Sequence, residues 1–237
     1  MGQWQYISIG DSLCADDYTG VPDAGASALL FHNNNELWPE FAGQDLASHF
    51  PGAVHVDLHS NGASLEDVYK VQAREVGTYE GVELVTVAAG ANDLLSVVDQ
   101  LAPEAGWVDE EKLSRAQSNF QVFFGNVVQT LRELAPHATV LVNNLFDPND
   151  GRGKAKPWRT WGGLGKFIQQ INGAITAACA EHNCHVVDMH GILRAHAKGP
   201  NKHEPLLIKV VEPNALGAHT IRMAWWNKLK ELGVVVG

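Results

Sequence analysis

The sequence predicts an α/β protein, and more specifically a flavodoxin-like three-layer α/β/α sandwich around a five-stranded parallel sheet. Two observations lead to this prediction. Short apolar runs rich in β-branched and aromatic residues alternate along the chain with longer segments of helical periodicity. Each apolar run is also followed by a polar or glycine-rich segment, as expected where a strand ends in a loop. With 237 residues, the chain is expected to form a single domain over residues 1–237.

Five apolar runs predict the strands. The first reads Trp-Gln-Tyr-Ile-Ser-Ile and is stopped abruptly by the turn residues Gly10-Asp11-Ser12. The runs cover residues 4–9, 54–58, 84–89, 139–142 and 186–187.

Five segments with helical periodicity lie between or after these runs. They cover residues 38–49, 64–74, 110–134, 164–181 and 215–232. Strands that alternate with helices form a parallel sheet, in which ligands bind at the carboxyl ends of the strands. Functional residues are therefore expected in the loops that follow the strands.

Two long loops are expected near such a site. Residues 14–35 separate the first strand from its helix and predict a lid or a loop that contacts substrate. Residues 147–161 form a polar loop after the fourth strand and predict a rim of the site, where Trp158 and Trp161 are candidates for lining an apolar acyl pocket. Trp225 and Trp226, in the last helical segment, are expected to pack in the core and at its edge.

Charge and composition argue against several classes of partner. Lysine and arginine number 17 against 27 acidic residues, a net charge of −10, and no basic run is present. A nucleic-acid partner or an anionic membrane surface is therefore disfavoured. No apolar stretch approaches the ~18 residues that span a bilayer, and the N-terminus does not read as a signal peptide. The expected location is cytoplasmic, with secretion after removal of a leader as the alternative, and the sequence leaves the oligomeric state open.

The cysteines and histidines predict neither a disulfide framework nor a metal site. The three cysteines, Cys14, Cys179 and Cys184, are odd in number and form no CxxC pair, so reduced thiols are expected. There are eleven histidines, but they show no spacing that would place a set of ligands together.

Three of the predicted post-strand loops contain residues suited to acyl transfer. Ser12 follows the first strand directly and can act as a nucleophile if a base accepts its proton. Gly62 lies in the loop after the second strand, where a glycine allows a backbone N–H to approach a ligand closely. Asn92 follows the third strand and can direct its amide to the same place. Asp11 is expected to stabilise the first turn by hydrogen bonding.

These blocks resemble those of the SGNH, or GDSL, hydrolase family over nearly the whole chain. Gly10-Asp11-Ser12-Leu13 is similar to the nucleophile block, Gly62 to the oxyanion glycine, and Gly90-Ala91-Asn92-Asp93 to the block with the oxyanion asparagine. The resemblance implies that Ser12 attacks an acyl carbonyl, while the N–H groups of Ser12 and Gly62 and the amide of Asn92 stabilise the oxyanion. It also implies a small-molecule ester substrate and no metal or organic cofactor. Because the family spans lipids, acyl thioesters, aryl esters and acetylated sugars, esters of short acyl or O-acetyl groups are taken as the default expectation.

The fourth block departs from the family pattern. The family carries Asp-x-x-His-Pro-Asn, whereas this chain reads Lys209-Val210-Val211-Glu212-Pro213-Asn214. Glu212 thus stands in the position of the catalytic histidine and Lys209 in that of its aspartate.

Three interpretations of this departure remain open. Glu212 can itself accept the Ser12 proton, provided that burial raises its pKa from about 4.3. Alternatively a histidine from another loop reaches Ser12 and Glu212 orients it. The candidates are His196, His190 and His203, whereas His219 lies about two helical turns beyond Glu212 and should point elsewhere. Finally, the chain can be a catalytically impaired binding protein on a hydrolase scaffold. A nucleotide-binding function is poorly supported, because neither GxGxxG nor a P-loop lysine is present.

Overall fold

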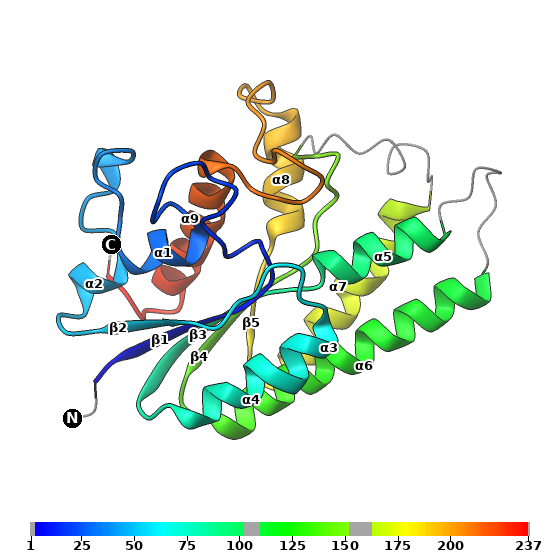
Figure 1. Ribbon diagram of the computed structural model, residues 1–237, viewed down its shortest axis with the longest axis horizontal. Coiled ribbons are helices and arrows are strands. Elements are labelled where there is room, and N and C mark those ends of the chain that lie inside the picture. The colour runs from blue at the N-terminus through cyan, green and yellow to red at the C-terminus, as the bar shows by residue number, and fades with distance from the viewer. Residues whose placement is uncertain (1–2, 102–109, 152–162, 237) are drawn as a thin grey trace.

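Five parallel strands form one sheet, in the spatial order β2-β1-β3-β4-β5 (Figure 1). The computed structural model describes residues 3–101, 110–151 and 163–236. The strands are β1 (Gln5–Gly10), β2 (Val54–Asp57), β3 (Val82–Ala88), β4 (Thr139–Asn143) and β5 (His185–Val187). This is the flavodoxin-like order, and it confirms the predicted fold class and all five predicted strands.

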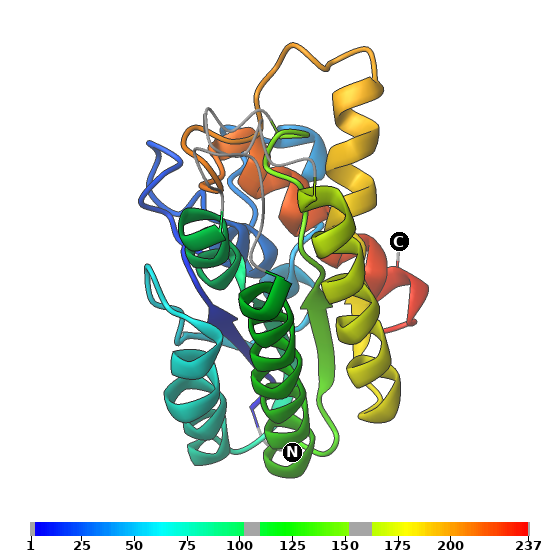
Figure 2. The same cartoon turned by 90° about the vertical axis from the view of Figure 1, so that its right-hand side faces the viewer.

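Side chains that alternate along the strands divide the core into two layers. Ile7 and Ile9 of β1 point into the layer covered by α6 (Glu110–Leu134) and α7 (Leu164–Glu181). Those helices lie side by side on that face of the sheet (Figure 2). Tyr6 points to the opposite layer, which contains α1 (Ala26–Phe31), α8 (Met189–Lys198) and α9 (Ala215–Glu231). The sheet is thus covered on both faces, as a parallel sheet requires.

The longest predicted helices are confirmed, since α6 and α7 have the predicted bounds and α9 ends one residue early. The predicted helix over residues 38–49 is wrong. That segment forms a 3₁₀ turn, η1 (Pro39–Phe41), and a short helix, α2 (Leu46–His49), separated by Gly43 at φ +79°. The left-handed conformation of Gly43 ends the first turn, and the Asp45 side chain caps the second by accepting from Ser48 N–H.

The predicted helix over residues 64–74 is interrupted by a wider turn. It begins as α3 (Leu65–Asp67), continues as the π-helical segment η2 (Val68–Gln72) and α4 (Ala73–Glu75), and closes with the 3₁₀ turn η3 (Val76–Thr78). π-Helical turns of this kind often occur at functional sites. The side chain of Gln72, at the end of η2, proves to be important for the site.

Three helices were not among the predicted segments. They are α1, inside the predicted loop 14–35, α5 (Ala91–Leu101), and α8. Tertiary contacts explain α1, since its six residues are too few to be stable alone and Leu29 and Leu30 are fully buried. Helix α8 has a local signal, because Asp188 caps it by accepting from Gly191 N–H.

The remaining packing predictions have mixed outcomes. Trp225 and Trp226 are buried as predicted, and the Trp225 indole donates to Asn143 Oδ1 over 2.7 Å. All three cysteines are buried free thiols, as predicted. Trp158 and Trp161 lie outside the described residues, with most of the predicted rim loop. Within the described ranges, none of the helices has the length and apolar character needed to cross a bilayer.

Candidate active site

The turn that carries Ser12 begins at Gly10, the last residue of β1. Gly10 has φ +140°, and a Cβ atom there would lie 2.0 Å from the carbonyl oxygen of Ala88 in β3. The next residue, Asp11, donates its N–H to that same carbonyl over 2.9 Å. Only glycine allows the two strands to approach so closely at this point. Ser12 is consequently placed at the carboxyl end of β1, with 2% of its surface exposed.

The fully buried carboxyl of Asp11 joins the turns that follow β1 and β3. One oxygen accepts from Leu13 N–H at 3.0 Å and the other from Ala91 N–H at 3.3 Å. Burial raises the pKa of Asp11 to about 7 despite these two donors, and the charge of Glu212 raises it further. Asp11 thus holds the turn together, in agreement with the role expected from the sequence.

Gln72 is the main residue of this turn that sequence analysis missed. Its amide forms two hydrogen bonds with the backbone of Gly10, accepting from the N–H at 2.7 Å and donating to the carbonyl at 3.0 Å. Gln72 is buried and comes from η2, 62 residues away in the sequence. A glutamine in a helical pattern carries no sequence signal for this contact, since the π turn and the tertiary packing direct it to Gly10.

The loop that follows β2, which contains Gly62, contacts the loop that follows β3, which contains Asn92. Asn92 donates its side-chain amide to Ala63 O over 3.0 Å, next to Gly62. Gly62 itself has φ +79° and is exposed. Within the part of the chain that the structure describes, neither Gly62 N–H nor Ser12 N–H donates a hydrogen bond to another residue. Two backbone donors at the site are therefore available to a ligand.

Glu212 lies on a tight turn just before α9. Ile208 N–H donates to Glu212 O over 2.9 Å, and Leu207 and Pro213 form an antiparallel bridge around it. Asn214 then caps α9, accepting from Gly217 N–H at 2.9 Å. The Pro-Asn-x-x-Gly part of the fourth block thus has a structural role, which does not depend on the residue in the position of the base.

This turn brings the Glu212 carboxyl to the Ser12 hydroxyl. Partial burial raises the pKa of Glu212 above its ordinary value, while a hydrogen bond with the Ser12 side chain and the charge of Lys209 lower it in part. The Glu212 Oε2 atom is buried, with no hydrogen-bond partner among the described residues. Tyr18 lies close to the same carboxylate, whose charge raises the pKa of the phenol. Ser12 and Glu212 therefore lie close enough for the serine to affect the pKa of the carboxyl.

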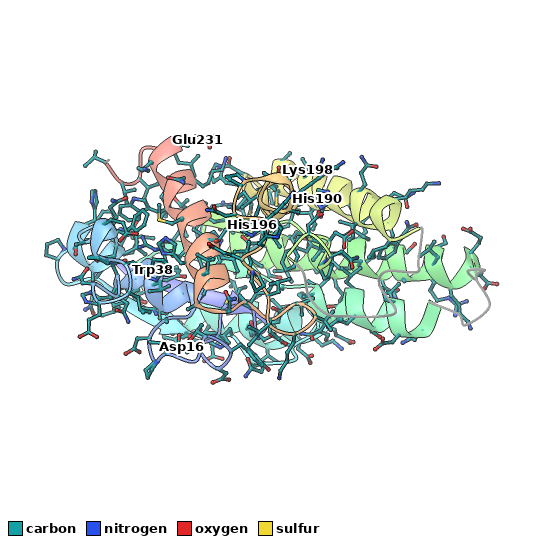
Figure 3. The ribbon with its side chains drawn as sticks, turned by 90° about the horizontal axis from the view of Figure 1, so that it is seen from above. Asp16, Trp38, His190, His196, Lys198 and Glu231 are labelled. Atoms are coloured by element: carbon teal, nitrogen blue, oxygen red, sulfur yellow. The ribbon has the colours of Figure 1, made fainter. Side chains whose placement is uncertain are left out.

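The histidines proposed as relocated bases have other surroundings. His196 bonds through Nε2 to the carbonyl of Glu204 at 2.8 Å, and His203 is exposed. His190 has a buried Nδ1 atom without a partner in the described ranges. Figure 3 shows His190 and His196 on α8, well separated from Asp16 in the loop after Ser12. No hydrogen bond joins any of the three histidines to Ser12 in the described structure, whereas the Ser12 side chain affects the pKa of Glu212.

Two other histidines belong to structural contacts. His219 stacks on Trp38 with ring centroids 3.9 Å apart, and burial lowers its pKa to about 4. It lies on α9 away from Glu212, as expected. His55 stacks on Tyr6 at 4.4 Å, inside β2. Within the described residues, no group of three or more histidine, cysteine or acidic side chains is arranged to hold a metal ion.

Comparison with solved structures gives many proteins of the same fold. The lipase Lip_vut3 from a goat rumen metagenome is 17% identical, with a TM-score of 0.66 over 94% of this chain and 96% of that one. The phospholipase A1 of Streptomyces albidoflavus NA297 is 18% identical, with a TM-score of 0.65 over 94% and 98%. An acetyl xylan esterase from Geobacillus stearothermophilus is 17% identical, with a TM-score of 0.62 over 98% and 96%. At such identities the similarity establishes the fold.

Sequence comparison identifies the family. A search of the curated proteins gives no significant match. The family model described as "GDSL-like Lipase/Acylhydrolase family" matches residues 8–218, a range that includes the Ser12, Gly62, Asn92 and Glu212 positions. The chain therefore belongs to the GDSL-like lipase/acylhydrolase family and is an ester hydrolase.

Proposed function

We propose that this protein is a serine esterase in which Ser12 is the nucleophile and Glu212 the general base. The observation that carries the proposal is the interaction of the Ser12 side chain with the Glu212 carboxyl, which lowers the pKa of Glu212 against the effect of burial. A carboxylate is ordinarily a weak base for a serine hydroxyl, but partial burial raises the pKa of Glu212. The change brings its basicity closer to what the reaction requires.

The first half-reaction forms an acyl-enzyme. The Ser12 Oγ–H proton moves to Glu212 as Oγ bonds to the ester carbonyl carbon, and the carbonyl π electrons move to its oxygen. When the tetrahedral intermediate collapses, the bond to the alcohol oxygen breaks and the protonated Glu212 returns its proton to that oxygen. The alcohol leaves, and the acyl group stays on Ser12.

The second half-reaction regenerates Ser12. Water attacks the acyl carbon and gives a proton to Glu212, and this proton passes to Ser12 Oγ as the carbon–oxygen bond breaks. The carboxylic acid then leaves. No group outside the chain is consumed except ester and water.

The oxyanion is proposed to bind to Ser12 N–H, Gly62 N–H and the Asn92 amide. Support comes from the two N–H groups that donate to no described residue, and from the bond between Asn92 and Ala63 O, which holds the asparagine beside Gly62. Preorganised donors of this kind typically contribute ~10²-fold or more each to the rate.

The proposed substrates are esters of short acyl groups, including O-acetyl groups. The fold is shared with proteins described as lipase, phospholipase A1 and acetyl xylan esterase, so the fold itself does not select an acyl length. Short acyl esters are therefore the first substrates to test.

The test compares hydrolysis of p-nitrophenyl acetate and butyrate by the wild type and by three variants. Ser12→Ala is expected to abolish turnover above background, and Glu212→Gln to reduce kcat/KM by about 10²-fold or more without loss of stability. His196→Ala is expected to retain activity, and Glu204→Gln is the matched control for an exposed carboxylate. Wild-type activity is expected to rise with pH through the raised pKa of Glu212, because the base must be ionised.

Two results would overturn the proposal. Full activity of Glu212→Gln together with an inactive His196→Ala would move the base to α8. Equal rates for wild type and Ser12→Ala on both esters would remove the serine mechanism and favour a binding protein on this scaffold.

A further inference from the structure

Lys209 lies on the same turn as Glu212 and contacts the loop that follows Ser12. Its ammonium lies 4.7 Å from the centroid of the Tyr18 ring, a cation–π contact between two segments far apart in sequence. Tyr18 belongs to the loop after the nucleophile, and Lys209 is exposed. The contact therefore joins the two segments that carry Ser12 and Glu212.

The backbone holds Lys209 and Glu212 close together on one turn, and the Lys209 side chain links this turn to Tyr18. The hydrogen bond from Ile208 N–H to Glu212 O closes the turn so that Lys209 and Glu212 occupy the same short loop. The Glu212 charge acts on the Tyr18 phenol, and the Lys209 charge acts on Glu212. Lys209, Tyr18 and Glu212 thus form one interacting cluster.

We infer that Lys209, held by the Tyr18 ring, is a positioning residue that keeps the Glu212 carboxylate ionised and so sets the pH range of the esterase. The inference rests on the proposed function, because it assumes that Glu212 is the base. It also gives a physical meaning to the unusual fourth block. An imidazole base is paired with an anion that stabilises its charged form, whereas a carboxylate base requires a cation.

The charged groups facing Glu212 have opposing effects. From its own turn, Lys209 favours the ionised form. From the nucleophile turn, Asp11 feels the Glu212 charge, which raises the pKa of Asp11, and the Ser12 side chain lowers the pKa of Glu212. From the following loop, Tyr18 is neutral at ordinary pH, and the Glu212 charge raises the pKa of the phenol. Lys209 is therefore the group whose removal shifts the balance towards protonated Glu212.

This role predicts effects of opposite sign at the two ends of the pH range. A cation beside a carboxylate keeps it ionised at lower pH but also makes it a weaker base. Lys209→Met should therefore lower kcat/KM by about two- to fivefold on the acid side of the wild-type profile, the size expected for an exposed charge interaction. On the alkaline plateau the variant should be as active as the wild type or more active. A merely structural loss would lower both limbs together.

The experiment is the pH–kcat/KM profile for p-nitrophenyl acetate, followed at the isosbestic wavelength of the product so that acid pH is accessible. Lys209→Arg should restore the wild-type profile, and Tyr18→Phe should retain it, whereas Tyr18→Leu should reproduce part of the Lys209→Met shift. Lys202→Met, which removes an exposed lysine from the loop over residues 199–204, is the matched control and should leave the profile unchanged. Salt at about 1 M should reduce the difference between Lys209→Met and wild type, since the charge interaction is screened.

The outcomes separate this inference from the proposed function. If Glu212→Gln is inactive while Lys209→Met and Lys209→Gln keep the wild-type acid limb, the inference is wrong and Glu212 remains the base. If both lysine variants lose activity equally at every pH, the role of Lys209 is structural and the inference is also wrong. If Glu212→Gln is fully active, the proposed base itself is wrong.

Discussion

The two turns that meet at the site are held in different ways. The turn over Gly10–Ser12 is buried. Its backbone forms hydrogen bonds with Ala88 O and with the Gln72 amide, and the Asp11 carboxyl accepts from two further backbone N–H groups. The turn over residues 207–213 exposes Ile208 and Lys209, and its Glu212 carboxylate has an unpartnered oxygen. A rigid turn leaves little freedom to change the nucleophile. The turn over residues 207–213 is held mainly by its backbone, and its side chains contribute little to the fold. The residue at position 212 can therefore be replaced without loss of the turn.

The largest expected effect comes from breaking the rigid turn at Gly10. A Gly10→Ala methyl would lie 2.0 Å from the Ala88 carbonyl oxygen, at a φ that disfavours side chains. We expect a loss of more than about 3 kcal/mol in the free energy of unfolding, measured by urea denaturation, and loss of esterase activity. Gly20→Ala is the matched control, since Gly20 has φ +74° but open space around its Cβ position, and it should cost about 1 kcal/mol. Equal costs for the two variants would contradict the close packing at Gly10.

Gln72→Leu tests the contact of the same turn with η2. It would remove both hydrogen bonds to Gly10 and leave a buried N–H without a partner. The expected cost is about 2 to 3 kcal/mol of stability, with kcat reduced roughly tenfold because Ser12 is less well positioned. Gln100→Leu, at an exposed glutamine of α5, should change stability by less than about 0.5 kcal/mol. Unaltered kcat in Gln72→Leu would show that the contact does not position the nucleophile.

Acidification should affect the stability contributions of His219 and Asp11 in opposite directions. Burial lowers the pKa of His219 to about 4, so the folded protein binds a proton there less tightly than the unfolded chain. Stability from this group is complete above its ordinary pKa of 6.5 and is lost as the pH falls towards 4. Asp11 acts in the opposite sense, because its pKa is raised to about 7 and its contribution falls as the pH rises from about 4 to about 7.

His219→Phe should therefore reduce the acid sensitivity while preserving the stacking on Trp38. At about pH 5 the wild type should lose about 2 kcal/mol at His219 relative to neutral pH, and the variant should not. Melting temperatures of both proteins from about pH 5 to about pH 8 measure the difference. Parallel curves would show that His219 does not titrate in this range.

The smallest expected effect is that of Asn214→Ala, next to the turn over residues 207–213. It removes the cap of α9 and the bond from its amide to Pro205 O, and it should cost about 1 kcal/mol of stability. Because the backbone bridge between Leu207 and Pro213 remains, kcat/KM should fall by less than about threefold. A loss of activity as large as that of Glu212→Gln would show that the cap, and not the side chain of Glu212, governs this turn.

The sequence by itself determined the fold class, the five strands and the nearly correct bounds of α6, α7 and α9. Apolar periodicity over such long segments survives packing, because the buried face of each element must remain apolar. It also placed Ser12, Gly62 and Asn92 in successive loops, since parallel strands bring those loops to one edge of the sheet. The departure at Glu212 and Lys209 was also visible in the sequence, because the neighbouring Pro-Asn-x-x-Gly residues match the fourth block of the family.

Only the tertiary structure decided which side chains meet. The contacts of Gln72 with Gly10, of Glu212 with Ser12 and of Lys209 with Tyr18 join residues far apart in the chain. No local pattern encodes them, because each depends on how several elements pack. The predicted helix over residues 38–49 failed for a related reason, since His219 stacks on Trp38 and Arg222 donates to Gln44 O, so that α9 holds this segment in short turns. Local sequence therefore sets the elements, and long-range packing decides which side chains surround Ser12.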